Sequence, residues 1–380
     1  MSCTGARRPM GRARLNPPGM SVFLSAMFFL CLSACGASVA PTSAGRTPVP
    51  GSVRWKAKVI DTQYAAPMAA ADGMVYVGSP SQTVNALDAR SGAQRWQVHL
   101  DVGSPYDKLP PFVWAAADGA VYVVSANQSG NAIYALDAAT GTQRWRVQTR
   151  DSLSAATVAS GALYFGSWSR TLYAFNAATG AQLWQNHTGS DKVSAPAVAG
   201  GMIFETSPVE NGFVYALDAM TGAQHWQVTA GSNCCAAPTV AHGVVYVASN
   251  DNFVYAFDAA TGAQRWRVHT GTDNLSTPTV ANGVVYFGSY DHSVYALDAV
   301  TGALRWRFQT PDRVLTAPTV ANGVVYVSAT ESDHYVYALD AATGTLRWRF
   351  EAGGVFFAPV VSGGLAYVGS NDGFLYALNT

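Results

Sequence analysis

The chain of 380 residues is poor in lysine and glutamate, with four of each, whereas arginine and aspartate number 19 each. Charged residues make up 12% of the sequence, about half of the usual proportion. Lysine and glutamate are strong helix formers at surface positions, and 36 glycines and 18 prolines interrupt longer helical patterns. The composition therefore argues against a helical bundle. A hydrophobic content of 49% also excludes a largely disordered chain.

Clusters of basic residues are missing after the N-terminal segment. The formal net charge is zero, but Arg7, Arg8, Arg12 and Arg14 are the only charged residues of positions 1–34. Removing these four leaves 23 − 4 = 19 basic residues against 23 acidic ones, a net charge of −4. Binding to nucleic-acid phosphates requires a basic surface. We therefore expect no nucleic-acid partner.

The N-terminal segment has the features of an export signal. The basic residues precede an apolar run from Val22 to Cys35, and these 14 residues are too few to cross about 30 Å of hydrocarbon. The run ends in Leu-Ser-Ala-Cys-Gly at 32–36, which resembles the bacterial lipobox. This resemblance implies a signal peptide over 1–34 and lipid attachment at Cys35. An ordinary signal peptide, cut after a small residue, is the alternative.

The residues after Cys35 indicate how the protein would be attached and to which membrane. Positions 35–52 are rich in Ser, Thr, Pro and Gly, which predicts a flexible tether. Two or three acyl chains would hold the protein stably on a membrane. Gly36 stands where lipoproteins kept in the inner membrane usually have aspartate, so the resemblance implies the outer membrane, facing the periplasm or the cell surface.

Tryptophan recurs at intervals of 41, 49, 39, 42, 40, 40 and 42 residues. The residues are Trp55, Trp96, Trp145, Trp184, Trp226, Trp266, Trp306 and Trp348. A repeat of this length is typical of propeller blades or of helical repeats. The unit 274–308 contains four short β-rich runs separated by turn residues such as Asn282-Gly283. Four antiparallel strands per repeat predict an all-β, eight-bladed propeller over 53–380.

Proline indicates which strand of each unit is innermost. Seven of the eight units share a proline in their first strand, at Pro67, Pro111, Pro196, Pro238, Pro278, Pro318 and Pro359. Proline cannot donate to a sheet ladder and favours edge strands, so the first strand should line a central channel and the tryptophan strand should be outermost. The last unit lacks a tryptophan strand, and residues 52–60 should supply it. We therefore expect the ring to close by pairing of the N- and C-terminal segments.

Seven segments share the pattern Ala-x-Asp-x-x-Thr-Gly-x-x-x-Trp, as in residues 216–226, with Ser91 replacing threonine in the first segment and Asn176 replacing aspartate in the third. The aspartate can accept backbone N–H groups of the turn, and the threonine can cap it. Glycine adopts positive φ at little steric cost, and a buried tryptophan contributes roughly 4–6 kcal/mol of gross burial free energy. The motif is therefore predicted to be structural, with the eight tryptophans as docking residues and no catalytic role for the aspartates.

The same pattern resembles the tryptophan-docking motif of the quinoprotein-like, or PQQ-type, propellers, and the resemblance covers all eight units. A lipobox, a short tether and one propeller are most similar in layout to the BamB family of outer-membrane lipoproteins. That resemblance implies a non-catalytic scaffold in outer-membrane protein assembly. Its partners would be envelope proteins, with the barrel-assembly machinery as the candidate.

The enzymes of the superfamily give the alternative, a PQQ-dependent dehydrogenase or a PQQ-binding sensor. They hold the quinone in the propeller funnel with a calcium ion and a catalytic aspartate, and they are usually much longer. This chain has short blades and only four glutamates. The histidines His99, His187 and His269 lie in different units, too far apart for one metal ion. No catalytic residue, metal or cofactor is predicted, and PQQ with calcium belongs to the alternative alone.

Cysteine is also scarce. Of five cysteines, Cys3 and Cys31 leave with the signal peptide and Cys35 would be acylated, so only Cys234 and Cys235 remain. This adjacent pair resembles the vicinal disulfide that lies against PQQ in some dehydrogenases. Neighbouring Cα atoms are 3.8 Å apart, below the ordinary disulfide range of about 4.4–6.8 Å, so such a bridge would be strained. Two small apolar residues without a bridge are the alternative.

A mostly apolar ring of residues precedes the inner-strand prolines by three positions. This candidate binding collar consists of Tyr64, Leu153, Val193, Cys235, Leu275, Leu315 and Phe356. Packing of the channel neck is the alternative reading. The second unit adds residues at 101–111 and 127–131, and such insertions commonly form partner-contact loops.

Overall fold

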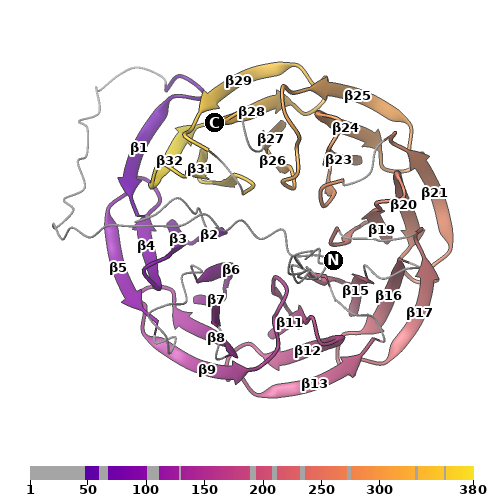
Figure 1. Cartoon of the computed structure of the whole chain (residues 1–380), viewed down its shortest axis with the longest axis horizontal. Helices are drawn as coiled ribbons and strands as arrows, with labels where there is room; N and C mark the ends of the chain where they lie inside the picture. Colours follow the sequence, from indigo (N-terminus) through magenta and orange to yellow (C-terminus); the bar gives the residue numbers. More distant parts are fainter. Residues whose placement is uncertain are drawn as a thin grey trace, which may run out of the picture. The chain divides into compact units, whose positions relative to one another are not determined.

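The computed structural model describes residues 48–59, 67–100, 111–127, 130–188, 194–207, 212–231, 236–271, 275–329, 333–354 and 357–380. These residues form eight four-stranded antiparallel sheets around a central axis (Figure 1). The eight-bladed propeller is thus confirmed. The described part of the chain contains strands and turns but no helix, and hence none that could cross a membrane.

Each blade is built from an inner strand outward. The innermost strands are β2 (Met68–Ala71), β6 (Phe112–Ala117), β10 (Thr157–Ala159), β14 (Ala197–Ala199), β18 (Thr239–Ala241), β22 (Thr279–Ala281), β26 (Thr319–Ala321) and β30 (Val360–Ser362). The second strands are β3 (Met74–Ser79), β7 (Ala120–Asn127), β11 (Ala162–Gly166), β15 (Met202–Ser207), β19 (Val244–Ala248), β23 (Val284–Ser289), β27 (Val324–Ser328) and β31 (Leu365–Gly369). We number the blades 1 to 8 in this order.

The two remaining layers complete the blades. The third strands are β4 (Thr83–Asp88), β8 (Gly130–Asp137), β12 (Thr171–Asn176), β16 (Phe213–Asp218), β20 (Phe253–Asp258), β24 (Ser293–Asp298), β28 (Tyr335–Asp340) and β32 (Phe374–Asn379). The outer strands are β5 (Gln94–His99), β9 (Gln143–Thr149), β13 (Gln182–His187), β17 (Gln224–Thr229), β21 (Gln264–His269), β25 (Leu304–Gln309), β29 (Leu346–Glu351) and β1 (Val53–Lys58).

The burial of each layer follows its sequence pattern. Second and third strands, such as β23 and β24, are almost continuously apolar because both of their faces are covered by neighbouring blades. The outer strands alternate, and in β25 Trp306 is buried between exposed residues. The innermost strands are short and only partly buried. The tryptophan strand is therefore outermost and the proline-led strand innermost, as predicted.

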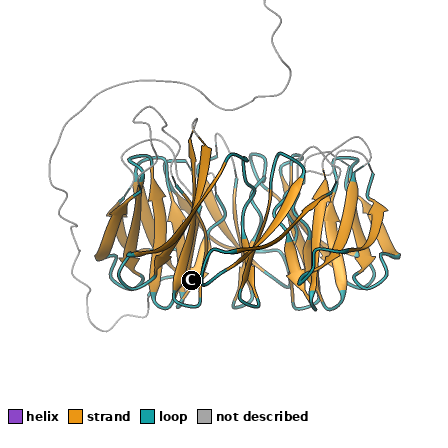
Figure 2. Cartoon of the chain, turned by 90° about the horizontal axis from the view of Figure 1, so that it is seen from below, coloured by secondary structure: helices purple, strands orange, loops and turns teal. Residues whose placement is uncertain are grey.

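The antiparallel order gives the ring two different faces (Figure 2). One face, which we call the motif face, carries the tight turns between first and second strands and the Asp-x-x-Thr-Gly turns between third and outer strands. The opposite face, the connection face, carries the turns between second and third strands and the connections between blades. On the motif face Asn282 and Gly283 both have positive φ, as a two-residue type I′ hairpin requires.

The ring closes by pairing of the chain ends. β1 lies antiparallel to β32, with Trp55 opposite Ala377, and so completes blade 8. The Gly51 amide donates to the carbonyl oxygen of Asn379 at 2.8 Å, and the Asn379 amide donates to the Ser52 carbonyl at 3.0 Å. The predicted closure is confirmed, and the predicted tether overlaps the ring at Gly51 and Ser52.

Deletion of residues 53–58 should destabilise the ring severely. It removes the outer strand of blade 8 with Trp55, exposes the edge of β32, and forfeits roughly 4–6 kcal/mol of gross burial, comparable with a typical net stability of about 5–15 kcal/mol. We expect aggregation or a loss of many degrees in melting temperature. Deletion of 37–47 is the control and should melt like the parent. Equal melting of both variants would contradict closure by β1.

Candidate functional site

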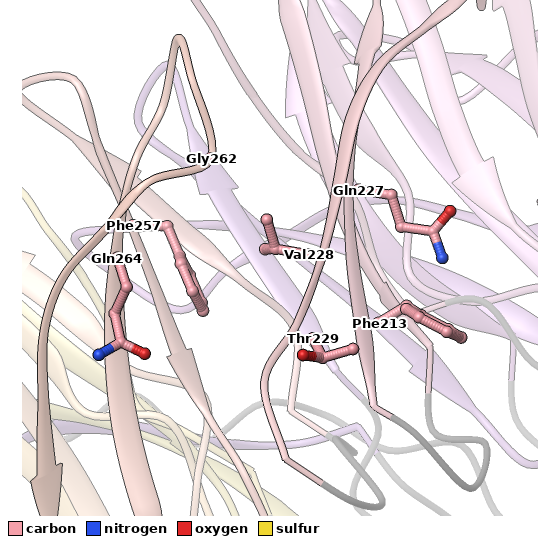
Figure 3. Close-up of a pocket in the computed structure, with 7 residues that line it drawn as sticks. All are labelled: Phe213, Gln227, Val228, Thr229, Phe257, Gly262 and Gln264. Carbon is pink, nitrogen blue, oxygen red and sulfur yellow. The ribbon is translucent and has the colours of Figure 1, made fainter.

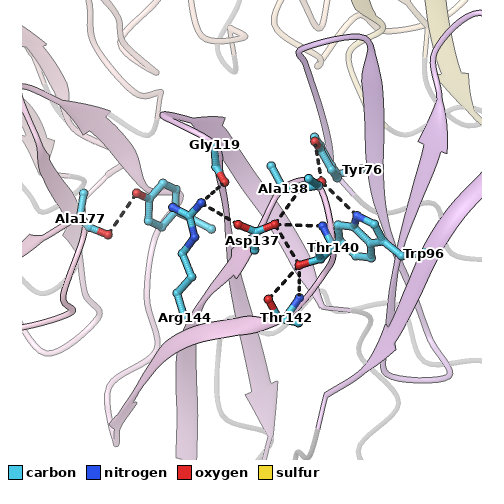
Figure 4. A network of polar contacts seen from close by, with 11 residues as sticks. Tyr76, Trp96, Gly119, Asp137, Ala138, Thr140, Thr142, Arg144 and Ala177 are labelled. Carbon is cyan, nitrogen blue, oxygen red and sulfur yellow. Dashed lines mark hydrogen bonds and ion pairs between the residues drawn. The ribbon is translucent and has the colours of Figure 1, made fainter.

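Neighbouring blades are joined by hydrogen bonds to one backbone carbonyl, a contact that we call the latch. Between blades 1 and 2, the Trp96 indole Nε1 donates to the Ala138 carbonyl at 3.0 Å, and the Tyr76 hydroxyl donates to the same oxygen at 3.2 Å (Figure 4). Seven docking tryptophans donate in this way at 2.9–3.1 Å, namely Trp55, Trp96, Trp145, Trp184, Trp226, Trp266 and Trp306. The tryptophans thus act between blades.

The Asp-x-x-Thr-Gly turn holds the accepting carbonyl in place. Asp137 Oδ1 accepts the backbone amides of Ala139 and Thr140 and the Thr140 hydroxyl, at 2.9–3.1 Å. Asp137 Oδ2 pairs with Arg144 Nη2 at 2.8 Å, and the same Nη2 donates to the Gly119 carbonyl (Figure 4). Arg144 is the extra residue of a β-bulge between β8 and β9. The bulge was not predicted from the sequence.

These bonds fix the charge of the motif aspartates. Hydrogen bonding from Arg144, and then from Thr140, lowers the pKa of Asp137 to about 2. The pKa values of Asp88, Asp258 and Asp340 are likewise lowered to about 2, with the partner arginine as the largest cause. Such carboxylates are ionised acceptors at neutral pH, unsuited to general acid catalysis.

The glycine of each turn lies flat against the preceding tryptophan. Gly141 has φ +75°, and a Cβ built there would lie 2.7 Å from the Trp96 ring. Seven other glycines meet docking tryptophans within 3.0 Å in the same sense, namely Gly51, Gly92, Gly180, Gly222, Gly262, Gly302 and Gly344. Gly51 belongs to the N-terminal segment and contacts Trp348. The chain ends therefore rebuild a split copy of the motif, with Asn379 in the place of the aspartate.

Gly141→Ala should lower stability more than Gly161→Ala. Both glycines have φ near +75°, so each alanine incurs the left-handed backbone strain of roughly 1–2 kcal/mol. Only the Cβ at 141 also overlaps an indole, whereas nothing lies within 4 Å of the Cβ at 161; overpacking adds typically about 1–3 kcal/mol. Urea unfolding measures the difference. Equal losses would show that the glycine–tryptophan contact is unimportant.

A second polar layer lies on the connection face of blades 5 to 8. The Asp251 carboxylate accepts the Tyr255 hydroxyl at 2.6 Å, and Asp333 accepts Tyr337 at the same distance. Burial, and then the aspartate bond, raises the pKa of these tyrosines well above its usual range. Cations of the outer strands lie over aromatic rings nearby, as with Arg267 over Phe253 at 5.1 Å. This layer also braces the blades.

Only part of the predicted collar falls on described residues. Leu275 is 7% exposed and packs in the core between blades 5 and 6, whereas Leu153 and Leu315 are half-buried. Leu275 and Leu153 bridge Ser289 and Ser167, respectively, at the start of their blades. The other collar residues, Tyr64, Val193, Cys235 and Phe356, lie outside the described residues, as do Cys35 and Cys234. Leu275 thus contributes to the core, and the binding role of the collar stays a prediction.

Two tryptophans outside the docking set distinguish blades 2 and 3. Trp114 lies at a bulge of β6 and stacks on Phe112 with ring centroids 5.4 Å apart. Trp168 lies in a turn of the connection face and is 56% exposed. Neither tryptophan was predicted to be a site residue, although Ala156 in place of the usual proline distinguishes blade 3 in the sequence. The insertion at 127–131 lengthens β7 and β8 to eight residues each.

The outer rim has an open groove between blades 4 and 5 (Figure 3). It has a volume of about 530 Å³ and is lined by Phe213, Gln227, Val228, Thr229, Phe257, Gly262 and Gln264. A second groove, of about 540 Å³, lies on the motif face beside the Asp88–Arg95 pair. The lining of the second groove includes the charged residues Asp72, Asp88, Arg90 and Arg95. Within the described ranges, no three His, Cys, Asp or Glu side chains gather as metal ligands would.

The fold and the latch define a tryptophan-docked, eight-bladed β-propeller. The family model described as the beta-propeller of beta-alanine-activating enzyme matches residues 65–380. The chain belongs to this β-propeller family.

The chain is also similar to two solved structures and to one protein of known sequence. BamB from Moraxella catarrhalis superposes with a TM-score of 0.69 at 22% identity, over 87% of this chain and 99% of that one. A quinohemoprotein alcohol dehydrogenase from Pseudomonas putida HK5 gives 0.63 at 18% identity, over 83% and 71%. The serine/threonine-protein kinase AfsK of Streptomyces griseus is 38% identical over 104 residues, 26% of this chain and 12% of the kinase. At these identities the structural matches establish the fold.

Proposed function

We propose that this protein is a lipid-anchored scaffold of the cell envelope that binds other proteins, in a BamB-like role in outer-membrane protein assembly. The observation that carries the proposal is the lipobox-like segment at 32–36 in front of a single propeller. The likeness to BamB over nearly the whole of both chains supports it. The motif residues are committed to joining blades, which leaves the connection face for partners.

The alternative is a PQQ-dependent dehydrogenase or a PQQ-binding sensor, in line with the fold of the quinohemoprotein neighbour. Calcium in such a site needs several oxygen ligands that converge on one point. The described aspartates of the motif are bound by their own turns, and Asp251 and Asp333 are bound by tyrosines. These residues do not fit a calcium and quinone site, so we derive no reaction step from one.

Cys35→Ser should release the protein from the membrane without unfolding it. The acyl chains would be attached outside the blades, so the melting temperature of the ring should not change. Fractionation of cells and immunoblotting measure the partition after a high-salt wash. Membrane retention of the variant would show that the lipobox interpretation is wrong.

A titration with PQQ and Ca²⁺ should separate the two functions. We expect no saturable change in quinone absorbance with the purified propeller, with a quinoprotein dehydrogenase as the positive control. Capture of the full-length lipoprotein from solubilised envelope should instead recover a barrel-assembly protein. Stoichiometric PQQ binding would contradict the scaffold proposal. So would the failure to recover any envelope protein together with the captured lipoprotein.

A further inference from the structure

Blade 4 has a buried carboxyl group at a strand position that is apolar in each of the other seven blades. Glu205, the fourth residue of β15, is 1% exposed. The aligned residues of the other second strands are Val77, Val123, Phe165, Val247, Phe287, Val327 and Val368. Val247 packs in a core cluster with Val214 and Ala230 of the preceding blade. By the same register, the Glu205 side chain faces blade 3.

Three side chains around this position have unsatisfied hydrogen-bonding groups. No hydrogen bond of normal geometry reaches either buried carboxyl oxygen of Glu205 or the buried hydroxyls of Thr188 and Ser207, although the Thr188 hydroxyl lies close enough to Glu205 to act weakly on its pKa. Ser207 lies two residues along β15 and therefore shares the face of Glu205, while Thr188 follows β13 of blade 3. Unpartnered buried polar groups destabilise the packing that encloses them. The boundary between blades 3 and 4 thus contains a polar defect.

The ionisation of Glu205 depends on this enclosure. Burial raises its pKa from 4.5 to about 8, and the nearby Thr188 hydroxyl opposes the shift only in part. Among the described residues, Tyr215 is a titratable neighbour, opposite Glu205 in the β15–β16 register, and its own pKa is raised by burial and then by Glu205. Leu172 and Ile203, in the core of the same boundary, are apolar. The closed ring therefore favours the neutral acid.

Blade 4 is also weakly joined to blade 5. Phe204 stands where six other blades have a tyrosine that donates to the latch carbonyl. Ala197 stands where Thr157, Thr239, Thr279 and Thr319 donate to the next inner-strand proline carbonyl. The Thr206 hydroxyl compensates in part through a bond to the Ala236 carbonyl at 2.8 Å.

The turn of blade 4 has a longer ion pair than the turns of blades 1, 2, 5, 6 and 7. His225 Nε2 lies 3.9 Å from Asp218, whereas the corresponding arginines approach their aspartates to 2.6–2.8 Å. This turn carries the Ala219 carbonyl that accepts Trp184 of blade 3. Substitutions at both boundaries of blade 4 therefore weaken contacts that four to six of the other blades make.

We propose that blade 4 is the pH-controlled opening point of the ring, where ionisation of Glu205 loosens blade 4 from blade 3. In the open form Glu205 is hydrated and loses its proton near the ordinary carboxyl value, while the closed form keeps the proton. Opening is therefore least favourable in acid. The equilibrium constant for opening increases by up to about tenfold per pH unit between the pKa of Glu205 in the open form and its pKa in the closed form. Above the pKa of the closed form it no longer changes with pH.

Hydrogen–deuterium exchange with mass spectrometry tests this proposal at pH 5.5 and 7.5, with rates normalised to the unfolded chain at each pH. In the wild type, protection of peptides from β13 and β14–β17 should fall by up to about a hundredfold over these two units. Glu205→Gln keeps the shape without the charge, and Glu205→Val restores the residue of the aligned blades. Both should remove the pH dependence. Glu351→Gln changes an exposed glutamate of blade 7 and should leave it intact.

The outcomes separate the two parts of the proposal. A pH dependence that persists in Glu205→Gln would show that Glu205 is not the controlling group. A dependence that Glu205→Gln removes, but that is spread evenly over all blades, would overturn blade 4 as the opening point. Melting temperatures of the same variants between pH 5.5 and 7.5 show independently whether each one remains folded.

Discussion

The structure depends on the latch, in which a tryptophan and usually a tyrosine of one blade donate to a single carbonyl of the next. One oxygen can accept both because a carbonyl has two lone pairs. The turn must then hold that oxygen still, which the aspartate does by binding three donors of its own turn. The glycine must also lack a side chain, since the indole occupies that space. The four fixed positions of the repeat are thus parts of one contact.

Each latch joins one blade to the next, so the last blade also needs a partner, which the start of the chain must provide. The chain solves this by dividing the motif between its termini, with Asn379 as the turn acceptor and Gly51 against Trp348. The same logic separates the faces. Every latch lies near the motif face, where residues vary little between blades. The connection face carries the insertion of blade 2, the exposed Trp168 and the connections between blades.

Most of the fold could be predicted because the latch leaves a periodic signal. Tryptophan spacing gave the blade count, proline gave the inner edge, and the incomplete last unit gave the closure. The contacts of the candidate site were harder to predict from the sequence. Burial of Leu275 depends on how two blades meet, and the bulge that turns Arg144 back to Asp137 depends on the register of β8 and β9. The Leu275 contact lies between two repeats, and the bulge is a one-residue shift of register inside a repeat that the residue types alone do not mark.

Near-identical repeats provide an internal reference for every position. In such a ring, a residue of one blade that differs from the aligned residues of the other seven shows where tight packing between blades has been given up. The departures gather in blade 4, with Ala197, Phe204, Glu205 and His225 each replacing a residue that would tighten a boundary. Glu205 differs from the other three because it adds a titratable group instead of removing a bond. Its neutral form fits an apolar boundary and its charged form does not, so the stability of this boundary varies with proton concentration, whereas the aligned position of the other seven blades holds valine or phenylalanine.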